Sequence, residues 1–76
     1  MPLLAGDGVG VEIRLNGDAK TLAAGTTAQQ LISDLGLENR RLAMEVNQEI
    51  LPRSRFNDYQ FQDGDQVEIV HAIGGG

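Results

Sequence analysis

The segment Thr27–Leu37 constrains the fold more than any other part of this sequence, because it carries both start and stop signals of a helix. Thr27 and Gln30 fit a capping box, in which the threonine hydroxyl accepts from a first-turn N–H and the glutamine side chain reaches back. Gly36 stands where a left-handed residue ends a helix, with Leu37 as its apolar follower. Between these signals, apolar residues recur at helical spacing: Ala28, Leu31, Ile32 and Leu35. We expect this stripe to lie across one face of a sheet, because a lone helix has to be covered by another layer.

A β-hairpin is expected before the helix. The segment Val11–Leu15 alternates apolar and charged residues, which is the period-two pattern of a half-buried strand. It is followed by Asn16-Gly17, the strongest short hairpin signal, because both residues tolerate the positive φ of a type I′ turn. The segment Lys20–Leu22 is then predicted to run back antiparallel to the first strand.

Three further strands are expected after the helix. The first is Leu42–Val46, with its apolar residues on one face; the turn Asn47-Gln48 leads from it to a short partner strand, Glu49–Leu51, which ends before a proline. An Asp-Gly-Asp turn at 63–65 precedes the last strand, Val67–Ala72. In the irregular segment 53–62 the expected anchors are Phe56, Tyr59 and Phe61.

This order of elements predicts an α+β fold, a mixed sheet of four to five strands with one main helix packed across one face. The connection through the helix is long enough for a parallel pairing, so we place the first and last strands side by side at the centre of the sheet. Residues 1–10 are expected to be a flexible extension, residues 11–73 the domain and residues 74–76 an exposed glycine tail.

Composition argues against a self-sufficient enzyme. The 76 residues contain no cysteine and a single histidine, His71, which excludes thiolate nucleophiles, disulfides and histidine-rich metal sites. The two aspartates of the 63–65 turn lack the ligand spacing of a calcium loop, and His71 has no partner acid at a recognisable spacing. We therefore expect no catalytic residue and no metal ligand.

The net charge of −5 favours a protein partner with a basic surface over nucleic acid or an anionic membrane. No stretch approaches the roughly 20 apolar residues of a transmembrane helix, and nothing resembles a targeting segment. A cytoplasmic protein that is monomeric on its own is expected.

Two sets of exposed side chains are candidates for partner docking. The first set is expected on the outer face of the last strand and its neighbour, where small apolar residues are surrounded by acids. The second is a pair of arginines that either bind carboxylate or phosphate of a partner or are solvated loop residues. The predicted docking residues are Ala43, Glu45, Glu68 and Val70 in the first set, and Arg53 and Arg55 in the second.

Three glycines, Gly74-Gly75-Gly76, follow the last strand. Taken alone they fit a frayed end. They also fit a thin tether for a reachable carboxylate, because glycine passes through a narrow cleft in any conformation. Without a cysteine, a catalytic triad or a metal cluster, the chain offers no other plausible reactive group than this carboxylate.

The sequence resembles the ThiS family, the ubiquitin-like sulfur carriers of bacterial thiamine biosynthesis. The resemblance covers about residues 11 to 76 and includes the run Val46-Asn47-Gln48-Glu49-Ile50-Leu51-Pro52-Arg53-Ser54, the 63–65 turn and the terminal glycines. Phe56 stands where a tryptophan is often found, and residues 1–10 have no counterpart.

The resemblance implies a β-grasp fold and a carrier that is not an enzyme and binds no cofactor itself. A ThiF-type adenylating enzyme would use ATP to activate the carboxylate of Gly76, tethered by Gly74 and Gly75. A sulfur donor system would convert it to a thiocarboxylate, and a ThiG-type thiazole synthase would receive the sulfur. Other interpretations stay open: the small subunit of molybdopterin synthase, a carrier for another pathway, a protein modifier, or a TGS-type binding module that is never thiolated.

Overall fold

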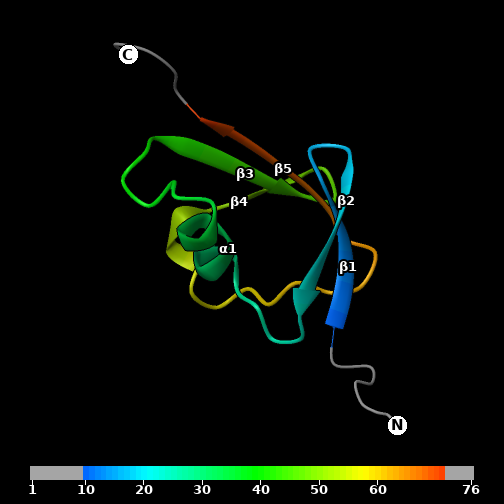
Figure 1. Cartoon of the computed structure of the whole chain (residues 1–76). Helices are drawn as coiled ribbons and strands as arrows, with labels where there is room; N and C mark the ends of the chain where they lie inside the picture. Colours follow the sequence, from blue (N-terminus) through cyan, green and yellow to red (C-terminus); the bar gives the residue numbers. More distant parts are fainter. Residues whose placement is uncertain (1–9, 72–76) are drawn as a thin grey trace, which may run out of the picture.

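Within residues 10–71, which the computed structural model describes, a five-stranded sheet has the order β2-β1-β5-β3-β4, and one helix lies across one of its faces (Figure 1). The elements in chain order are β1 (Gly10–Leu15), β2 (Asp18–Ala23), α1 (Ala28–Asp34), β3 (Leu42–Val46), β4 (Glu49–Leu51), the 3₁₀ turn η1 (Arg53–Arg55) and β5 (Gln66–His71). The predicted fold class is confirmed. The first strand begins one residue earlier than predicted, because Gly10 already pairs with Ala23 in the first hairpin.

Both predicted hairpins form, and both turn through residues with positive φ. Asn16 and Gly17 have φ of 51° and 91°, as a type I′ turn requires. Asn47 and Gln48 have φ of 54° and 73°, so the second hairpin places a glutamine where glycine is the usual choice. These turns fix the antiparallel registers of β1 with β2 and of β3 with β4.

β5 occupies the centre of the sheet, as the sequence predicts. It runs parallel to β1, with Leu15 opposite Val67. It runs antiparallel to the whole of β3, from Leu42 opposite His71 to Val46 opposite Val67. The predicted last residue of this strand, Ala72, lies outside the described residues. The strand is therefore held from both sides by hairpins that precede it in the chain.

The helix has the capping box expected from the sequence. The Thr27 hydroxyl accepts from the Gln30 N–H at 3.2 Å, and the Gln30 side-chain oxygen accepts from the Thr27 N–H at 2.9 Å. Gly36 has a φ of 74°, and the Leu37 N–H donates to the Ile32 carbonyl, which closes the C-terminal turn.

The apolar stripe predicted for the helix ends with Leu35, and the prediction that this residue is buried is wrong. Ala28, Leu31 and Ile32 are buried, but Leu35 is 38% exposed. The helix ends at Asp34, and Leu35 is its C-cap residue, so it lies at the open end of the stripe, where its side chain is only partly covered.

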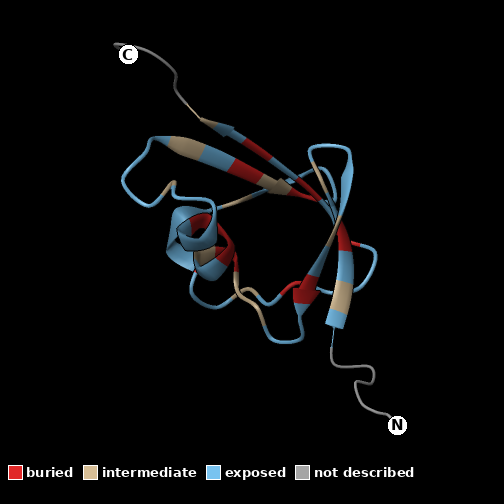
Figure 2. Ribbon diagram, viewed as in Figure 1, coloured by how far each residue is buried: buried red, intermediate tan, exposed pale blue. Residues whose placement is uncertain are grey.

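Buried side chains line the sheet face that is turned toward α1 (Figure 2). The segment after η1 closes this core: Phe56 and Phe61 are buried, and Tyr59 packs against them half-buried, as predicted. Its backbone also completes the helix, because the carbonyls of Tyr59 and Phe56 accept from the first N–H groups of α1.

A buried carboxylate, Asp65, joins this segment to the start of β5. Its Oδ2 accepts from the Tyr59 hydroxyl at 2.6 Å and from the Gln62 N–H at 2.9 Å, and its Oδ1 accepts from the Asn47 side-chain amide at 3.0 Å. The side chain is only 5% exposed. Sequence reasoning treated Asp65 as a turn residue and missed this network.

The two turn asparagines hold β5 from opposite sides. The Asn16 side chain accepts from the Ile69 N–H at 2.9 Å and donates to the Ile69 carbonyl at 3.3 Å. The Asn47 side chain accepts from the Gln66 N–H at 3.0 Å, while its backbone N–H donates to the Gln66 carbonyl at 2.7 Å. Both asparagines therefore combine the dihedral angles of a turn with hydrogen bonds to the central strand.

Tyr59 gives a pH dependence that can be measured directly. Burial, the hydrogen bond to Asp65 and the charge of Asp65 together raise the pKa of Tyr59 from 10.0 to about 12. The folded state thus holds the phenol proton more tightly than the unfolded state does. The stabilisation is fully present below about pH 10 and is lost as the pH rises toward 12.

Because the chain has one tyrosine and no tryptophan, the ultraviolet absorbance of tyrosinate reports Tyr59 alone. We expect the titration midpoint of Tyr59 in the folded chain to lie well above that in the urea-unfolded chain. We also expect the free energy of unfolding to fall between pH 10 and 12. The Tyr59→Phe variant is the control and should lack this decline. Equal midpoints for folded and unfolded chains would contradict the prediction.

Candidate functional site

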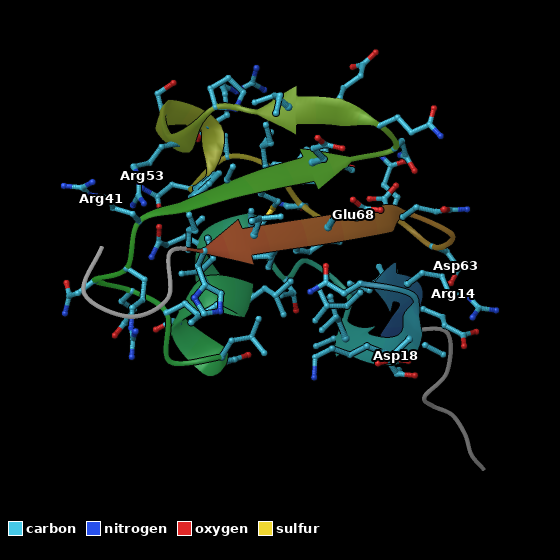
Figure 3. All side chains as sticks on the ribbon, turned by 90° about the horizontal axis from the view of Figure 1, so that it is seen from above. Arg14, Asp18, Arg41, Arg53, Asp63 and Glu68 are labelled. Carbon is cyan, nitrogen blue, oxygen red and sulfur yellow. The ribbon has the colours of Figure 1, made fainter. Side chains whose placement is uncertain are left out.

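The face of the sheet opposite the helix is the best-defined candidate surface within residues 10–71, and Figure 3 looks onto it. We call the side chains of β3 and β5 on this side the outer face: Ala43, Glu68 and Val70, which are exposed, and Glu45, which is half-buried. The register brings them together in two direct pairs, Ala43 opposite Val70 and Glu45 opposite Glu68. Their inward neighbours Met44, Val67 and Ile69 are buried, so the predicted division of the two strands into inner and outer residues is confirmed.

The outer face is not optimised for the stability of the isolated chain. Glu45 and Glu68 are directly opposite, and like charges in such a pair are destabilising. Val70 is 69% exposed beside them, and Ile50, which pairs with Glu45 from β4, is 63% exposed. Two exposed aliphatic side chains beside two carboxylates form a surface that an apolar and basic partner would cover favourably.

The second predicted set lies elsewhere. Arg53 and Arg55 belong to η1, after the edge strand β4, and both are exposed. Figure 3 shows Arg53 at the end of the sheet where β5 ends, away from Glu68. The six predicted docking residues therefore form two separate surfaces rather than one, and their roles stay predictions. The predicted tail residues Gly74, Gly75 and Gly76 lie outside the described residues.

Sequence reasoning missed two exposed residues next to these surfaces. Ile50 is the middle residue of Glu49–Leu51, and its alternation with Leu51 could have placed it on the outer face. Arg41 directly precedes β3, where the sequence offers no signal, because only the pairing of β3 with β5 brings it to the end of the central strand.

Within the part of the chain that the structure describes, no three histidine or acidic side chains are placed so that they could hold a metal ion. The same residues include no helix that is long and apolar enough to cross a membrane.

A mixed five-stranded sheet with this strand order and one helix across it is a ubiquitin-like β-grasp domain. The comparison with protein families then gives the particular family. The ThiS family model matches residues 13–76, and the chain belongs to the ThiS family.

Similar proteins support this assignment along nearly the whole chain. The chain is 38% identical over 65 residues to the sulfur carrier protein ThiS of Bacillus subtilis, a match that covers 84% of this chain and 98% of that protein. The crystal structure of the thiamine biosynthesis protein ThiS from Geobacter metallireducens has 30% sequence identity and a TM-score of 0.72, and the match covers 87% of this chain and all of that one.

A third similarity is to part of a larger protein. The chain is 38% identical over 66 residues to the thiazole synthase of Paramagnetospirillum magneticum, which covers 87% of this chain but 20% of that protein. The chain thus spans about a fifth of the length of this relative, and a second thiazole synthase, from Magnetococcus marinus, matches over the same fraction.

Proposed function

We propose that this protein is the sulfur carrier of thiamine biosynthesis and holds the sulfur at the C-terminal carboxyl of Gly76. The observation that carries the proposal is the family match, which extends from the first hairpin through the terminal glycines. It is supported by the similarity to the B. subtilis carrier, which covers 98% of that protein. In this role the chain is a protein co-substrate and not an enzyme.

The chemistry follows from the reactivity of a carboxyl group. An α-carboxyl is ionised at pH 7 and is then a poor electrophile. Attack of the Gly76 carboxylate on the α-phosphorus of ATP forms an acyl-adenylate and releases pyrophosphate. A sulfur nucleophile then displaces AMP, so that a carbon–sulfur bond replaces the carbon–oxygen bond of the anhydride. With hydrosulfide, or after reductive release from a persulfide donor, the product is a thiocarboxylate.

Two partners follow from this sequence of reactions. A ThiF-type enzyme binds the ATP and activates the tail, and a ThiG-type thiazole synthase accepts the sulfur in the cytoplasm. The second partner is supported by the P. magneticum thiazole synthase, because part of that chain is similar to this protein. The partners would bind the folded β-grasp domain while the tail reacts. We assign docking to the outer face, whose glutamates and Val70 suit a basic and apolar partner surface.

Intact-mass spectrometry tests the proposal. The full chain is incubated with a ThiF-type enzyme, ATP and a sulfur donor. The expected product is heavier by the replacement of one oxygen by sulfur, and fragmentation should place the change at Gly76. Omission of ATP is the control and should leave the mass unchanged.

An unmodified chain, under conditions that thiolate the B. subtilis carrier, would overturn the proposal. A deletion strain separates the pathways: a requirement for added thiamine supports this role. Loss of molybdoenzyme activity with normal thiamine synthesis would instead assign the chain to molybdopterin synthesis.

A further inference from the structure

Two arginines lie together at the end of the sheet where β5 ends. Leu42 pairs with His71, so Arg41 comes just beyond the last pair of β3 with β5. Arg53 reaches the same place from η1, because its Nη2 donates to the carbonyl of Arg40, the neighbour of Arg41. Figure 3 shows both side chains at this end, beyond the arrowhead of β5. We call Arg41 and Arg53 the basic pair.

In the basic pair, the Arg53 side chain is held in place by contacts within the domain, whereas the Arg41 side chain is not. The Arg53 guanidinium lies over the Phe56 ring, with its central carbon 5.6 Å from the ring centroid, and Phe56 is itself part of the core. This contact and the bond to Arg40 orient Arg53 before any partner arrives, which lowers the entropy lost on binding. No hydrogen bond or ion pair within residues 10–71 holds the exposed Arg41 side chain, so its donors are available.

The two ends of β5 differ in charge. Figure 3 shows Glu68, Asp63 and Asp18 toward the end where β5 begins, with one arginine, Arg14, among them. Four of the six basic residues of this acidic chain belong instead to the two segments that meet at the other end: Arg40, Arg41, Arg53 and Arg55. The basic residues of the domain are therefore concentrated near the end of the strand that leads to the tail.

We propose that the basic pair binds carboxylates on the rim of the cleft through which the activating enzyme takes up the tail. This inference rests on the proposed function and adds the chemistry of one partner contact. Gly76 is five residues beyond His71, and five extended residues span about 17 Å. The reacting phosphate is therefore far from the basic pair when the tail is drawn out, while the rim of the cleft is close. Planar guanidinium groups match carboxylates in bidentate geometry.

The basic pair and the outer face together would orient the domain. The outer face carries Glu45 and Glu68 and requires a basic complement, whereas the basic pair requires an acidic one. A partner with both a basic and an acidic surface attracts the domain in the orientation in which the tail points into the cleft. The reversed orientation places like charges together, which is unfavourable. Such steering acts mainly on the association rate and weakens with salt.

The test compares Arg41→Glu with Lys20→Glu in the full chain. Lys20 gives the same charge change on the edge strand β2, which β1 separates from β5. Association with the ThiF-type enzyme is followed by stopped-flow fluorescence of a labelled enzyme at low and high salt. We expect Arg41→Glu to associate about tenfold more slowly at low salt, with a difference that shrinks as salt rises, and Lys20→Glu to stay near wild type.

Several results would overturn this inference while leaving the proposed function intact. One is an unchanged association rate for Arg41→Glu in a chain whose wild type is thiolated. Another is an equal slowing by Lys20→Glu, which would indicate only net charge. A third is a raised KM for ATP with normal association, which would assign Arg41 to nucleotide phosphate. Failure of the wild-type chain to be thiolated would instead reject the proposed function. Thermal unfolding of both variants confirms that each is folded.

Discussion

The Gly75→Val variant is expected to remain folded and to lose thiocarboxylate formation. Gly75 is outside the segment that contains the core, so the unfolding midpoint should equal that of the wild type. A β-branched side chain restricts the backbone and widens the tether, which displaces the Gly76 carboxylate from the nucleotide in the partner's cleft. A misplacement of about 1 Å costs on the order of a hundredfold in rate, so a loss of at least that size is expected.

The measurement is the rate of ATP-dependent pyrophosphate release with the ThiF-type enzyme, together with the intact mass of the carrier. Ala19→Val is the control, because it places the same β-branched side chain at an exposed position of β2 and should react normally. Activation of Gly75→Val at the wild-type rate would show that the cleft does not require a thin tether.

Asp65→Ala is expected to cause a large loss of stability. The carboxylate is the acceptor for the Tyr59 hydroxyl, the Gln62 N–H and the Asn47 amide, and its removal leaves these donors without that partner in a buried site. These bonds are part-buried, and the loss of each costs about 1 kcal/mol, so the sum is about 3 kcal/mol. That is a large fraction of the stability of a small domain.

Urea unfolding followed by circular dichroism measures this loss. Asp63→Ala is the matched control from the same turn, because Asp63 is exposed and accepts one hydrogen bond, from the Glu12 N–H. It should cost about 1 kcal/mol or less. In Asp65→Ala the pKa of Tyr59 should also fall toward its ordinary value, since two of the three causes of its rise are removed. Equal unfolding midpoints for the two variants would show that the network contributes little.

Local patterns predicted most of the fold. Asn16-Gly17 and the Thr27 capping box act within a few residues of the chain, and each forms as expected. Strand alternation correctly separated inner from outer residues on β3 and β5, which is why Glu68 and Val70 were assigned to the right face. These predictions succeed because the same short-range sterics and periodicity operate in any fold.

The missed features all depend on contacts between distant segments. Asp63 and Asp65 are equivalent in the sequence pattern, and only the fold brings Tyr59 and Asn47 to the second of them. Arg41 acquires its position from the pairing of β3 with β5. Leu35 fits the helical period, but the helix ends one residue earlier. Such features require tertiary structure, because no local signal distinguishes the alternatives.

The central position of β5 has a mechanical consequence. A pull on the residues that follow His71 acts along the strand, parallel to β1 and antiparallel to β3. The backbone hydrogen bonds on both sides of β5 are therefore loaded in shear, and they share the force. When an edge strand is pulled sideways from a sheet, by contrast, its hydrogen bonds break one at a time. The side chains of Asn16 and Asn47 add two further attachments, at Ile69 and at Gln66. A partner that grips and moves the chain end would thus drag the whole domain as a rigid body, without unravelling the strand to which the end is attached.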